Sequence, residues 1–142
     1  MKVTREFSFE AAHMLSGYVG QCKNLHGHSY KLQVTVEGSP GHRQGDPDAE
    51  MVIDFTDLKA IVQKEVIDRV DHAIIFSNYS YRKDAEEELY RWATKYGMKC
   101  VELNGRCTAE TIAAWIRGAL IRKIGGDIHV RLWETEKSFT EV

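Results

Sequence analysis

Three histidines occupy positions whose spacing suits a metal site. His26 and His28 are two residues apart in a segment that reads as a strand, so their side chains project to the same side. His13 ends another alternating segment, and it falls on the same face of that segment as the apolar residues. If the two segments pair as a hairpin with matching inner faces, the three imidazoles meet at one end of the sheet. Three neutral imidazoles with an open fourth position are typical of a catalytic zinc site.

The alternative for any single histidine is an ordinary partly buried or strand-end side chain. The HxH pattern with a third histidine at the same end of its neighbour favours metal over that alternative. We expect ordinary roles for His42, in a polar loop, and for His129, on the outer parity of the last strand.

Cys22 is a candidate base or nucleophile. It lies four residues before His26, and a thiol near a cation has a lowered pKa. Its alternative is a buried small hydrophobic residue, which is the interpretation we give to Cys100 and Cys107. Three cysteines without a CxxC pair do not form a disulfide framework, so the sequence predicts a cytoplasmic protein.

Asp71 and His72 form the next candidate pair. A carboxylate can orient an imidazole and stabilise its charged form, although neighbours in sequence need not touch each other. A DH dipeptide alone is weak support for catalysis.

Glu134 places a carboxylate on the parity of the apolar residues of the last strand. A buried charge needs a cation, a hydrogen-bonding network or a ligand, and a bidentate carboxylate suits the N–C–N edge of a guanine or pterin ring. The alternative is a salt bridge to Arg131 or Arg117. Glu110 is explained equally well as a favourable charge in the first turn of a helix.

The elements that must position these residues follow from the apolar periodicity. Strands are predicted for the opening segment to His13, for about 27–37, for 51–55, for 98–103 and for 128–135. A polar connection covers 39–50, and the remaining predictions are helices. The first helix begins at Asp54 or Thr56, and its inward residues are Leu58, Ile61, Val62, Val66 and Val70. The second helix spans 84–96, and its inward residues are Leu89, Trp92, Ala93 and Tyr96. The third helix is capped by Thr108. This order predicts an α+β domain with helices on one face of an antiparallel sheet.

Composition limits the function classes. The chain has 142 residues, of which 43% are hydrophobic and 28% charged, which predicts one folded domain over 1–142. A net charge of −2 argues against a nucleic-acid partner, and no apolar run suits a membrane span. The first residues alternate and lack the pattern of a signal peptide.

With these residues in place, the sequence resembles the family of 6-pyruvoyl-tetrahydropterin and 6-carboxy-tetrahydropterin synthases. The matching stretches occur in the family's order and span nearly the whole chain. They are FSFEAAH (7–13), CKNLHGH (22–28), MVIDFTDLK (51–59), VDHAI (70–74), TAETIAAWI (108–116) and VRLWET (130–135).

The resemblance implies the tunnelling fold (T-fold), an antiparallel sheet with two main helices on one face. It also implies that three subunits close a barrel and that two trimers stack into a hexamer, which leaves no free sheet edges. Three departures from the family pattern are a longer segment at 78–103, Cys107 in place of a frequent proline, and an end seven residues after Thr135 that predicts a short final strand. We expect 78–103 to be a family-variable insertion.

The resemblance also assigns roles to single residues. It implies zinc held by His13, His26 and His28, a catalytic triad of Cys22, Asp71 and His72 in a site formed between subunits, and pterin contacts from Thr108, Glu110 and Glu134. The implied substrate is 7,8-dihydroneopterin triphosphate.

The resemblance leaves two branches of chemistry. The carboxy branch is a carbon–carbon lyase that gives 6-carboxy-5,6,7,8-tetrahydropterin, acetaldehyde and triphosphate for queuosine and other 7-deazapurines. We favour it because the compact chain and the CxxxHGH spacing are similar to bacterial members. The alternatives are a 6-pyruvoyl-tetrahydropterin synthase that eliminates triphosphate, a folate-pathway relative, and a non-enzymatic zinc- or pterin-binding module.

Overall fold

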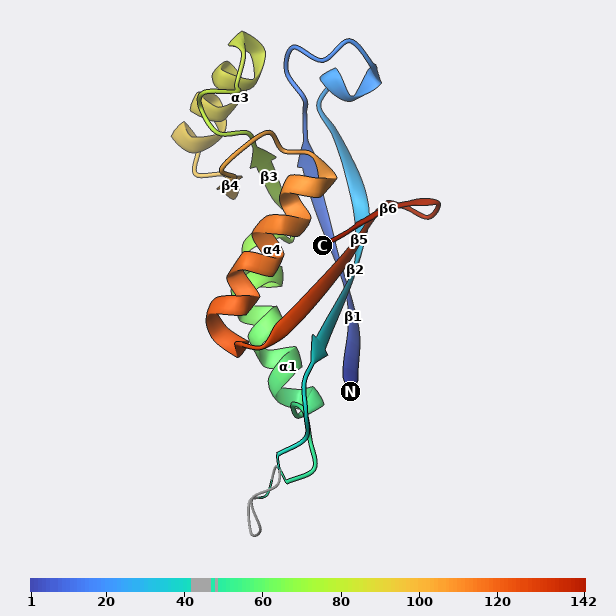
Figure 1. The fold of residues 1–142 in the computed structure, drawn as a ribbon. Coiled ribbons are helices and arrows are strands. Elements are labelled where there is room, and N and C mark those ends of the chain that lie inside the picture. Colours follow the sequence, from blue (N-terminus) through green and yellow to red (C-terminus); the bar gives the residue numbers. More distant parts are fainter. Residues whose placement is uncertain (42–46, 48) are drawn as a thin grey trace.

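Six strands form one sheet in the computed structural model, which describes residues 1–41, 47 and 49–142. The strands lie side by side in the order β4-β3-β1-β2-β5-β6 (Figure 1). The pairs β1–β2, β2–β5 and β5–β6 are antiparallel. The pairs β1–β3 and β3–β4 are parallel. The bounds are β1 Lys2–His13, β2 His26–Glu37, β3 Ala73–Phe76, β4 Cys100–Glu102, β5 Asp127–Thr135 and β6 Ser138–Glu141.

The hairpin of β1 and β2 is the centre of the sheet. It pairs along its whole length, from Lys2 opposite Glu37 to His13 opposite His26. A short 3-10 helix, η1 (Gln21–Lys23), lies in the loop that joins the two strands. Because side chains alternate along a strand, this register fixes which residues of both strands face the helices.

Two helical segments cover one face of the sheet (Figure 1). The first runs through α1 (Phe55–Val62), a π-helical turn η2 (Gln63–Ile67) and α2 (Asp68–Val70). Asp54 caps it, since its Oδ1 accepts from the backbone N–H of Thr56 at 2.6 Å. The second is α4 (Ala109–Ile124), which is capped by Thr108.

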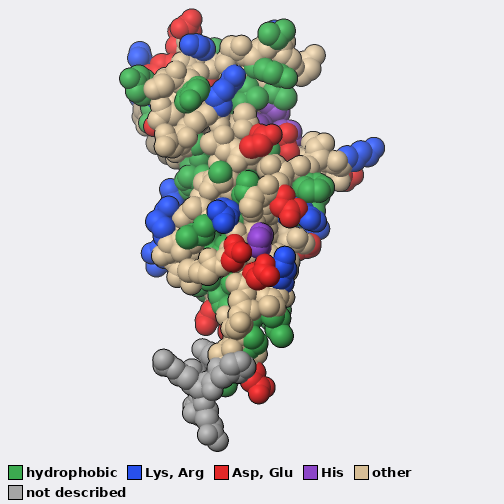
Figure 2. Space-filling model, viewed as in Figure 1, with side chains coloured by type: hydrophobic (Ala, Val, Ile, Leu, Met, Phe, Trp, Pro, Cys, Tyr) green, Lys and Arg blue, Asp and Glu red, His purple; other side chains and the backbone are tan. Residues whose placement is uncertain are grey.

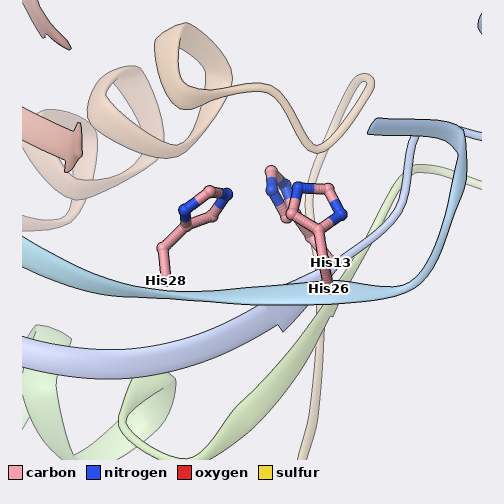
Figure 3. Close-up of side chains that lie close together, drawn as sticks. All are labelled: His13, His26 and His28. Atoms are coloured by element: carbon pink, nitrogen blue, oxygen red, sulfur yellow. The ribbon is translucent and has the colours of Figure 1, made fainter. Parts of the chain in front are cut away.

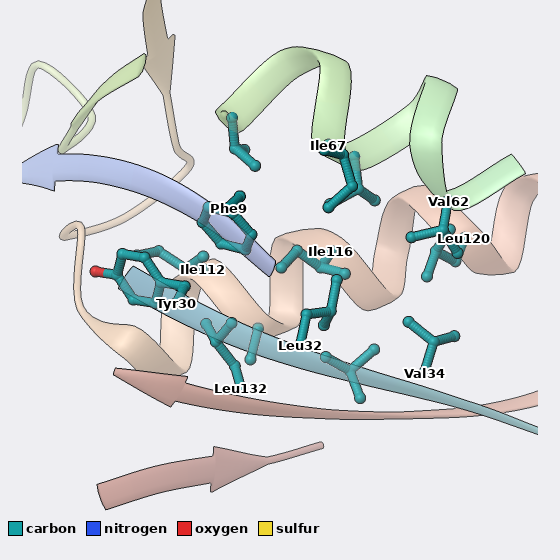
Figure 4. Packing of buried hydrophobic residues seen from close by; sticks show 14 of the residues in the cluster. Phe9, Tyr30, Leu32, Val34, Val62, Ile67, Ile112, Ile116, Leu120 and Leu132 are labelled. Atoms are coloured by element: carbon teal, nitrogen blue, oxygen red, sulfur yellow. The ribbon is translucent and has the colours of Figure 1, made fainter. Parts of the chain in front are cut away.

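The core lies between these helices and the sheet. Figure 4 shows side chains from both helical segments interlocking with those of β1, β2 and β5. Its fully buried larger members are Tyr30, Phe9, Leu32, Leu58, Ile75, Leu103, Ile112, Ile116, Leu120, Ile128 and Leu132. The α+β class with two main helices on one face is therefore confirmed.

The third helix, α3 (Asp84–Lys95), lies at the end of the sheet beside β4 (Figure 1). Its buried residues are Glu86 and Ala93, and Tyr90 packs on Phe76 with 5.2 Å between ring centroids. The prediction that Trp92 and Tyr96 face inward was wrong, because the buried stripe begins at Glu86 and leaves these two side chains 50% and 64% exposed.

Other predictions also differ from the structure. No strand forms at 51–55, because the Asp54 side chain caps a helix that already includes Phe55. Strands β3 and β6 were not predicted, nor was parallel pairing. Part of the predicted 39–50 connection, including His42, lies outside the described residues. Among the helices that are described, none has the length and apolar character needed to cross a membrane.

Candidate active site

The three histidines meet at one end of the sheet. His13 and His26 are directly opposite in the β1–β2 ladder, and His28 follows on the same side of β2 (Figure 3). The ring centroids are 4.6 Å apart for His13 and His26, 5.2 Å for His13 and His28, and 4.9 Å for His26 and His28. One nitrogen from each ring lies within 4.8 Å of the others. The hairpin thus brings three potential ligand atoms together.

Backbone carbonyls orient two of the rings. His13 Nδ1 lies 2.7 Å from the carbonyl oxygen of Cys107, and His26 Nδ1 lies 2.7 Å from that of Asn24. A carbonyl only accepts hydrogen bonds, so each Nδ1 carries the proton and donates it. The Nε2 lone pairs are therefore free to bind a metal, as in proteins whose ligating histidines are held by a second hydrogen bond.

Burial favours the neutral form of His13 and of His28. His13 is 2% exposed, and burial lowers the pKa of His13 and also that of His28. Within the described residues, Nε2 of both rings is buried without a hydrogen-bond partner. Neutral, converging and unpartnered imidazole nitrogens fit a metal ion.

Glu134 faces this cluster from β5. Its Oε1 is 3.6 Å from His13 Nε2 and 3.8 Å from His28 Nε2, and its side chain is 28% exposed. The alternative of a salt bridge to Arg131 or Arg117 is not found in the described part of the chain. Arg131 binds Glu141 at 2.7 Å, and Arg117 donates to the Ile128 carbonyl at 2.7 Å.

The start of α4 borders the same region. Thr108 follows the carbonyl that holds His13, and its Oγ1 accepts from the N–H of Thr111 at 3.4 Å. Glu110 is exposed and lines a small cleft with Glu134. That cleft has a volume of about 130 Å³ and is completed by Ala109, Ser138, Phe139 and Thr140. Glu134, Glu110 and the helix start are therefore close neighbours.

Cys22 lies in η1, between the two strands that carry the histidines. Its thiol is half-buried, and its carbonyl accepts from the N–H of Leu15 at 2.8 Å. Burial first, and then the charge of Glu134, raise the pKa of Tyr30. Cys22 lies four residues before His26, the first residue of β2. Cys107 is fully buried as predicted, whereas Cys100 is only partly buried.

Asp71 and His72 are in contact but lie elsewhere. His72 Nδ1 is 3.1 Å from Asp71 Oδ2, and a hydrogen bond from the backbone N–H of Glu10 lowers the pKa of Asp71. His72 adopts a left-handed conformation (φ 58°) and its side chain is 78% exposed. It borders a cleft of about 380 Å³ whose lining includes Glu10, Ser29 and also His28. Within the described residues, no hydrogen bond or ion pair joins the Asp71–His72 pair to the three histidine rings.

Two features went unnoticed in the sequence. Glu86 is fully buried, where it accepts from Ser16 Oγ at 2.5 Å and from the N–H of Ser77 at 2.8 Å. An acidic residue in the first turn of an amphipathic helix is normally solvated, so no sequence signal set it apart. The second feature is Tyr30, whose hydroxyl is buried and has no hydrogen-bond partner in the described part of the chain.

A second cluster of possible ligands lies at the other end of the sheet. Glu37, Asp127 and His129 place one ligand atom each within 4.8 Å of one another. These side chains are 37–60% exposed, and Lys2 Nζ lies 3.4 Å from Glu37. Solvent and the ammonium group satisfy these carboxylates, so this cluster reads as a surface ion-pair network.

Comparison with known proteins gives a consistent result. A family model described as 6-pyruvoyl tetrahydropterin synthase matches residues 2–142. A 6-carboxy-5,6,7,8-tetrahydropterin synthase from Haemophilus influenzae is 43% identical over 141 residues, which cover 99% of this chain and 96% of that protein. A protein of the same name from Synechocystis is 32% identical over 114 residues, 75% of this chain and 88% of its own length.

Solved structures agree with the fold. A 6-pyruvoyltetrahydropterin synthase variant from Plasmodium vivax superposes with a TM-score of 0.73 at 25% identity, covering all of this chain and 96% of its own. The Caenorhabditis elegans 6-pyruvoyl tetrahydropterin synthase has a TM-score of 0.68 at 24% identity and is covered to 94%. The T-fold expected from the sequence is confirmed by this likeness.

Proposed function

This chain belongs to the 6-pyruvoyl tetrahydropterin synthase family, and we propose that it is a 6-carboxy-5,6,7,8-tetrahydropterin synthase. The reaction is a carbon–carbon lyase reaction that converts 7,8-dihydroneopterin triphosphate to 6-carboxy-5,6,7,8-tetrahydropterin, acetaldehyde and triphosphate. The product is a precursor of queuosine and other 7-deazapurines. The observation that carries the proposal is the 43% identity to the Haemophilus influenzae synthase over 99% of this chain.

The proposed metal is zinc, and its proposed ligands are His13, His26 and His28. The fit rests on the chemistry of the donors, since these are imidazoles whose Nε2 atoms converge, and two of their Nδ1 atoms already donate to carbonyls. When bound, zinc supplies Lewis acidity that makes a neighbouring hydroxyl and the carbon beside it more acidic.

Glu134 is the proposed anchor for the pterin. Its carboxylate can accept two hydrogen bonds from the N–C–N edge of the ring, and its position beside His13 and His28 would hold the ring next to the metal. Thr108 and Glu110 are proposed to line the same pocket, which is supported by the cleft that Glu110 shares with Glu134.

Proton transfer is assigned to Cys22, Asp71 and His72. Cys22 lies in the loop that joins the two histidine-bearing strands, whereas the Asp71–His72 pair comes just before β3 and makes no hydrogen bond or ion pair to the histidine rings among the described residues. We infer that the pair serves the histidine site of another copy of the chain. The backbone of His72 has a positive φ, and residues with this strained backbone conformation cluster at functional sites.

The proposed assembly is a homohexamer made of two trimers, each closing a barrel. Two observations support assembly. Strands β4 and β6 are the edges of the single-chain sheet. Hydrophobic side chains are also gathered at the end of the molecule that carries α3 and the β1–β2 loop (Figure 2), where the exposed ones include Tyr18, Val19, Leu25, Tyr79, Tyr81, Trp92, Tyr96 and Met98.

The remaining assignments follow from the same proposal. The chain is treated as one domain over 1–142, with 78–103 as a family-variable insertion that includes α3 and β4. The partner is a small molecule rather than nucleic acid or a membrane. The free cysteines suit the cytoplasm as the compartment.

A product assay tests the proposed reaction. Zinc-loaded protein is incubated with 7,8-dihydroneopterin triphosphate, and products are resolved by mass. Acetaldehyde together with a 6-carboxy pterin is the expected result. Triphosphate release with the three-carbon side chain retained would instead assign the pyruvoyl reaction, which the name of the matching family model favours as the second candidate. Absence of any product from the zinc-loaded protein would contradict both.

A further inference from the structure

Tyr30 has a buried hydroxyl that the mechanism above does not use. The residue lies on β2, two positions after His28, and is 1% exposed. Among the described residues its oxygen has no hydrogen-bond partner. Figure 4 shows Tyr30 at one end of the core cluster with the hydroxyl oxygen pointing away from the apolar side chains. A buried hydroxyl without a partner destabilises a fold, and phenylalanine would fill the same space without that cost.

The ring is fixed by its neighbours. It stacks on Phe9 with 4.9 Å between centroids and an interplanar angle of 16°. It also meets His28 edge-on at 5.5 Å and His13 at 6.3 Å. The hydroxyl is therefore held in one place, at the histidine end of the core, on the same face of the sheet as the proposed metal ligands.

The hydroxyl is placed to donate its hydrogen. Its oxygen is buried and makes no hydrogen bond to the described residues. Its hydrogen is therefore available to an acceptor that enters the site. An anionic acceptor, or one that gains negative charge during a reaction, benefits most from a fixed donor in a site that excludes water.

We propose that the Tyr30 hydroxyl donates a hydrogen bond to an oxygen atom of the pterin side chain when the substrate binds beside His13 and His28. The inference rests on the proposed function, since it names how that site recognises the hydroxylated side chain. In the carbon–carbon cleavage the hydroxyl on this oxygen loses its own proton, so the oxygen gains negative charge and the same hydrogen bond strengthens and stabilises the transition state. Tyr30 is then both a binding and a catalytic residue.

Tyr30→Phe tests the proposal, with Tyr90→Phe on α3 as the matched control. The first measurement needs no turnover. Binding is compared for 7,8-dihydroneopterin, which has the hydroxylated side chain, and for 6-methyl-7,8-dihydropterin, which lacks its hydroxyls. We expect Tyr30→Phe to weaken the first by about tenfold, the loss of one buried hydrogen bond, and to leave the second unchanged. Tyr90→Phe leaves both unchanged.

Stability and kinetics add two further readouts. In the metal-free protein, Tm of Tyr30→Phe should equal or exceed that of the wild type, because an unsatisfied hydroxyl is removed. With zinc content unchanged, kcat for the triphosphate substrate should fall by about 100-fold, as for loss of one preorganised donor.

The outcomes separate this proposal from the proposed function. If the wild type binds both pterins and Tyr30→Phe binds them equally well, the role of Tyr30 is wrong and the pterin function stands. If the wild type binds neither pterin, the pterin function fails and the role of Tyr30 fails with it. A lowered Tm in the metal-free variant would show that the hydroxyl has a structural partner and would also overturn the inference.

Discussion

His13 donates from Nδ1 to the carbonyl oxygen of Cys107 at 2.7 Å, across 94 positions of sequence. The bond connects the last residue of β1 to the segment that begins α4. Because it sets which ring nitrogen is protonated, the placement of Cys107 determines that Nε2 of His13 is free to bind a metal. A remote backbone segment thus prepares the most buried of the three proposed ligands.

Cys107 is itself held by buried contacts. Its N–H donates to Ser77 Oγ at 3.2 Å, and its thiol donates to the Met14 carbonyl at 3.0 Å. Ser77 in turn donates its N–H to the buried carboxylate of Glu86 at 2.8 Å. The start of α3 therefore supports the loop that orients His13.

His28→Ala should abolish stoichiometric zinc binding. Changing a residue that only hydrogen-bonds to a metal ligand lowers metal affinity by about 10- to 100-fold. Removing one of the three ligands themselves should therefore weaken zinc affinity by more than about 100-fold. Metal content per chain, measured after desalting, checks this. His129→Ala, in the surface cluster with Glu37 and Asp127, should keep the zinc of the wild type. Full zinc retention in His28→Ala would refute the ligand assignment.

Acid should destabilise the metal-free protein. Burial lowers the pKa of His13 and His28 from the ordinary value of 6.5, so in the folded chain both resist protonation. Below pH 6.5 the unfolded chain binds more protons at these positions, and the free energy of unfolding decreases as the pH falls further. Above that pH the contribution is constant. Urea unfolding at about pH 7.5 and about pH 5.5 measures the difference. His28→Gln should show a smaller decrease, and an equal decrease would contradict the explanation.

Strict alternation made parts of the fold predictable. The strands that end at His13 and Glu37 carry apolar residues at every second position. Their register places the histidines at the same end of the sheet, as the alternation predicted. The helix capped by Thr108 also formed where its apolar stripe and capping residue predicted it. Glu134 reached the apolar side for the same reason of parity.

Tertiary contacts decided what the sequence did not reveal. Strand β3 has four residues of which three are buried, so it shows no alternation that distinguishes it from other apolar runs. At 51–55 the capping bonds of Asp54 prevailed over a weak strand pattern. The partner of His13 depends on where Cys107 lies in the folded chain, and the position of His72 depends on how β3 joins the sheet.

Cys22→Ala should keep zinc and fold but lose turnover. Among the described residues, the Cys22 thiol makes no hydrogen bond, and the contact of the η1 loop with Leu15 comes from the Cys22 backbone. Loss of a proton-transfer group lowers kcat by about 10²- to 10⁴-fold. The matched control is Cys100→Ala on β4, which should retain wild-type kcat. Near-normal turnover of Cys22→Ala would remove the thiol from the mechanism.

Glu86→Ala should destabilise the protein strongly. It leaves the N–H of Ser77 and the hydroxyl of Ser16 without their acceptor, and each buried unsatisfied group costs about 1–3 kcal/mol. The free energy of unfolding in urea should therefore fall by about 2–5 kcal/mol. Glu88→Ala, at an exposed position of the same helix, should leave it unchanged. A variant as stable as the wild type would show that the buried carboxylate contributes nothing to α3 docking.

Mixed assemblies should reveal whether two copies share each site. Cys22→Ala and His72→Ala are each expected to be inactive, because each lacks one part of the proposed proton-transfer triad. When the two are unfolded together and refolded as a mixture, random assembly gives about a quarter of the sites an intact Cys22 from one copy and an intact Asp71–His72 pair from its neighbour. Activity should then recover to about a quarter of the wild-type value, measured as product formed per chain. If both parts came from the same chain, no mixture would contain an intact site, and the refolded mixture would stay as inactive as either variant alone.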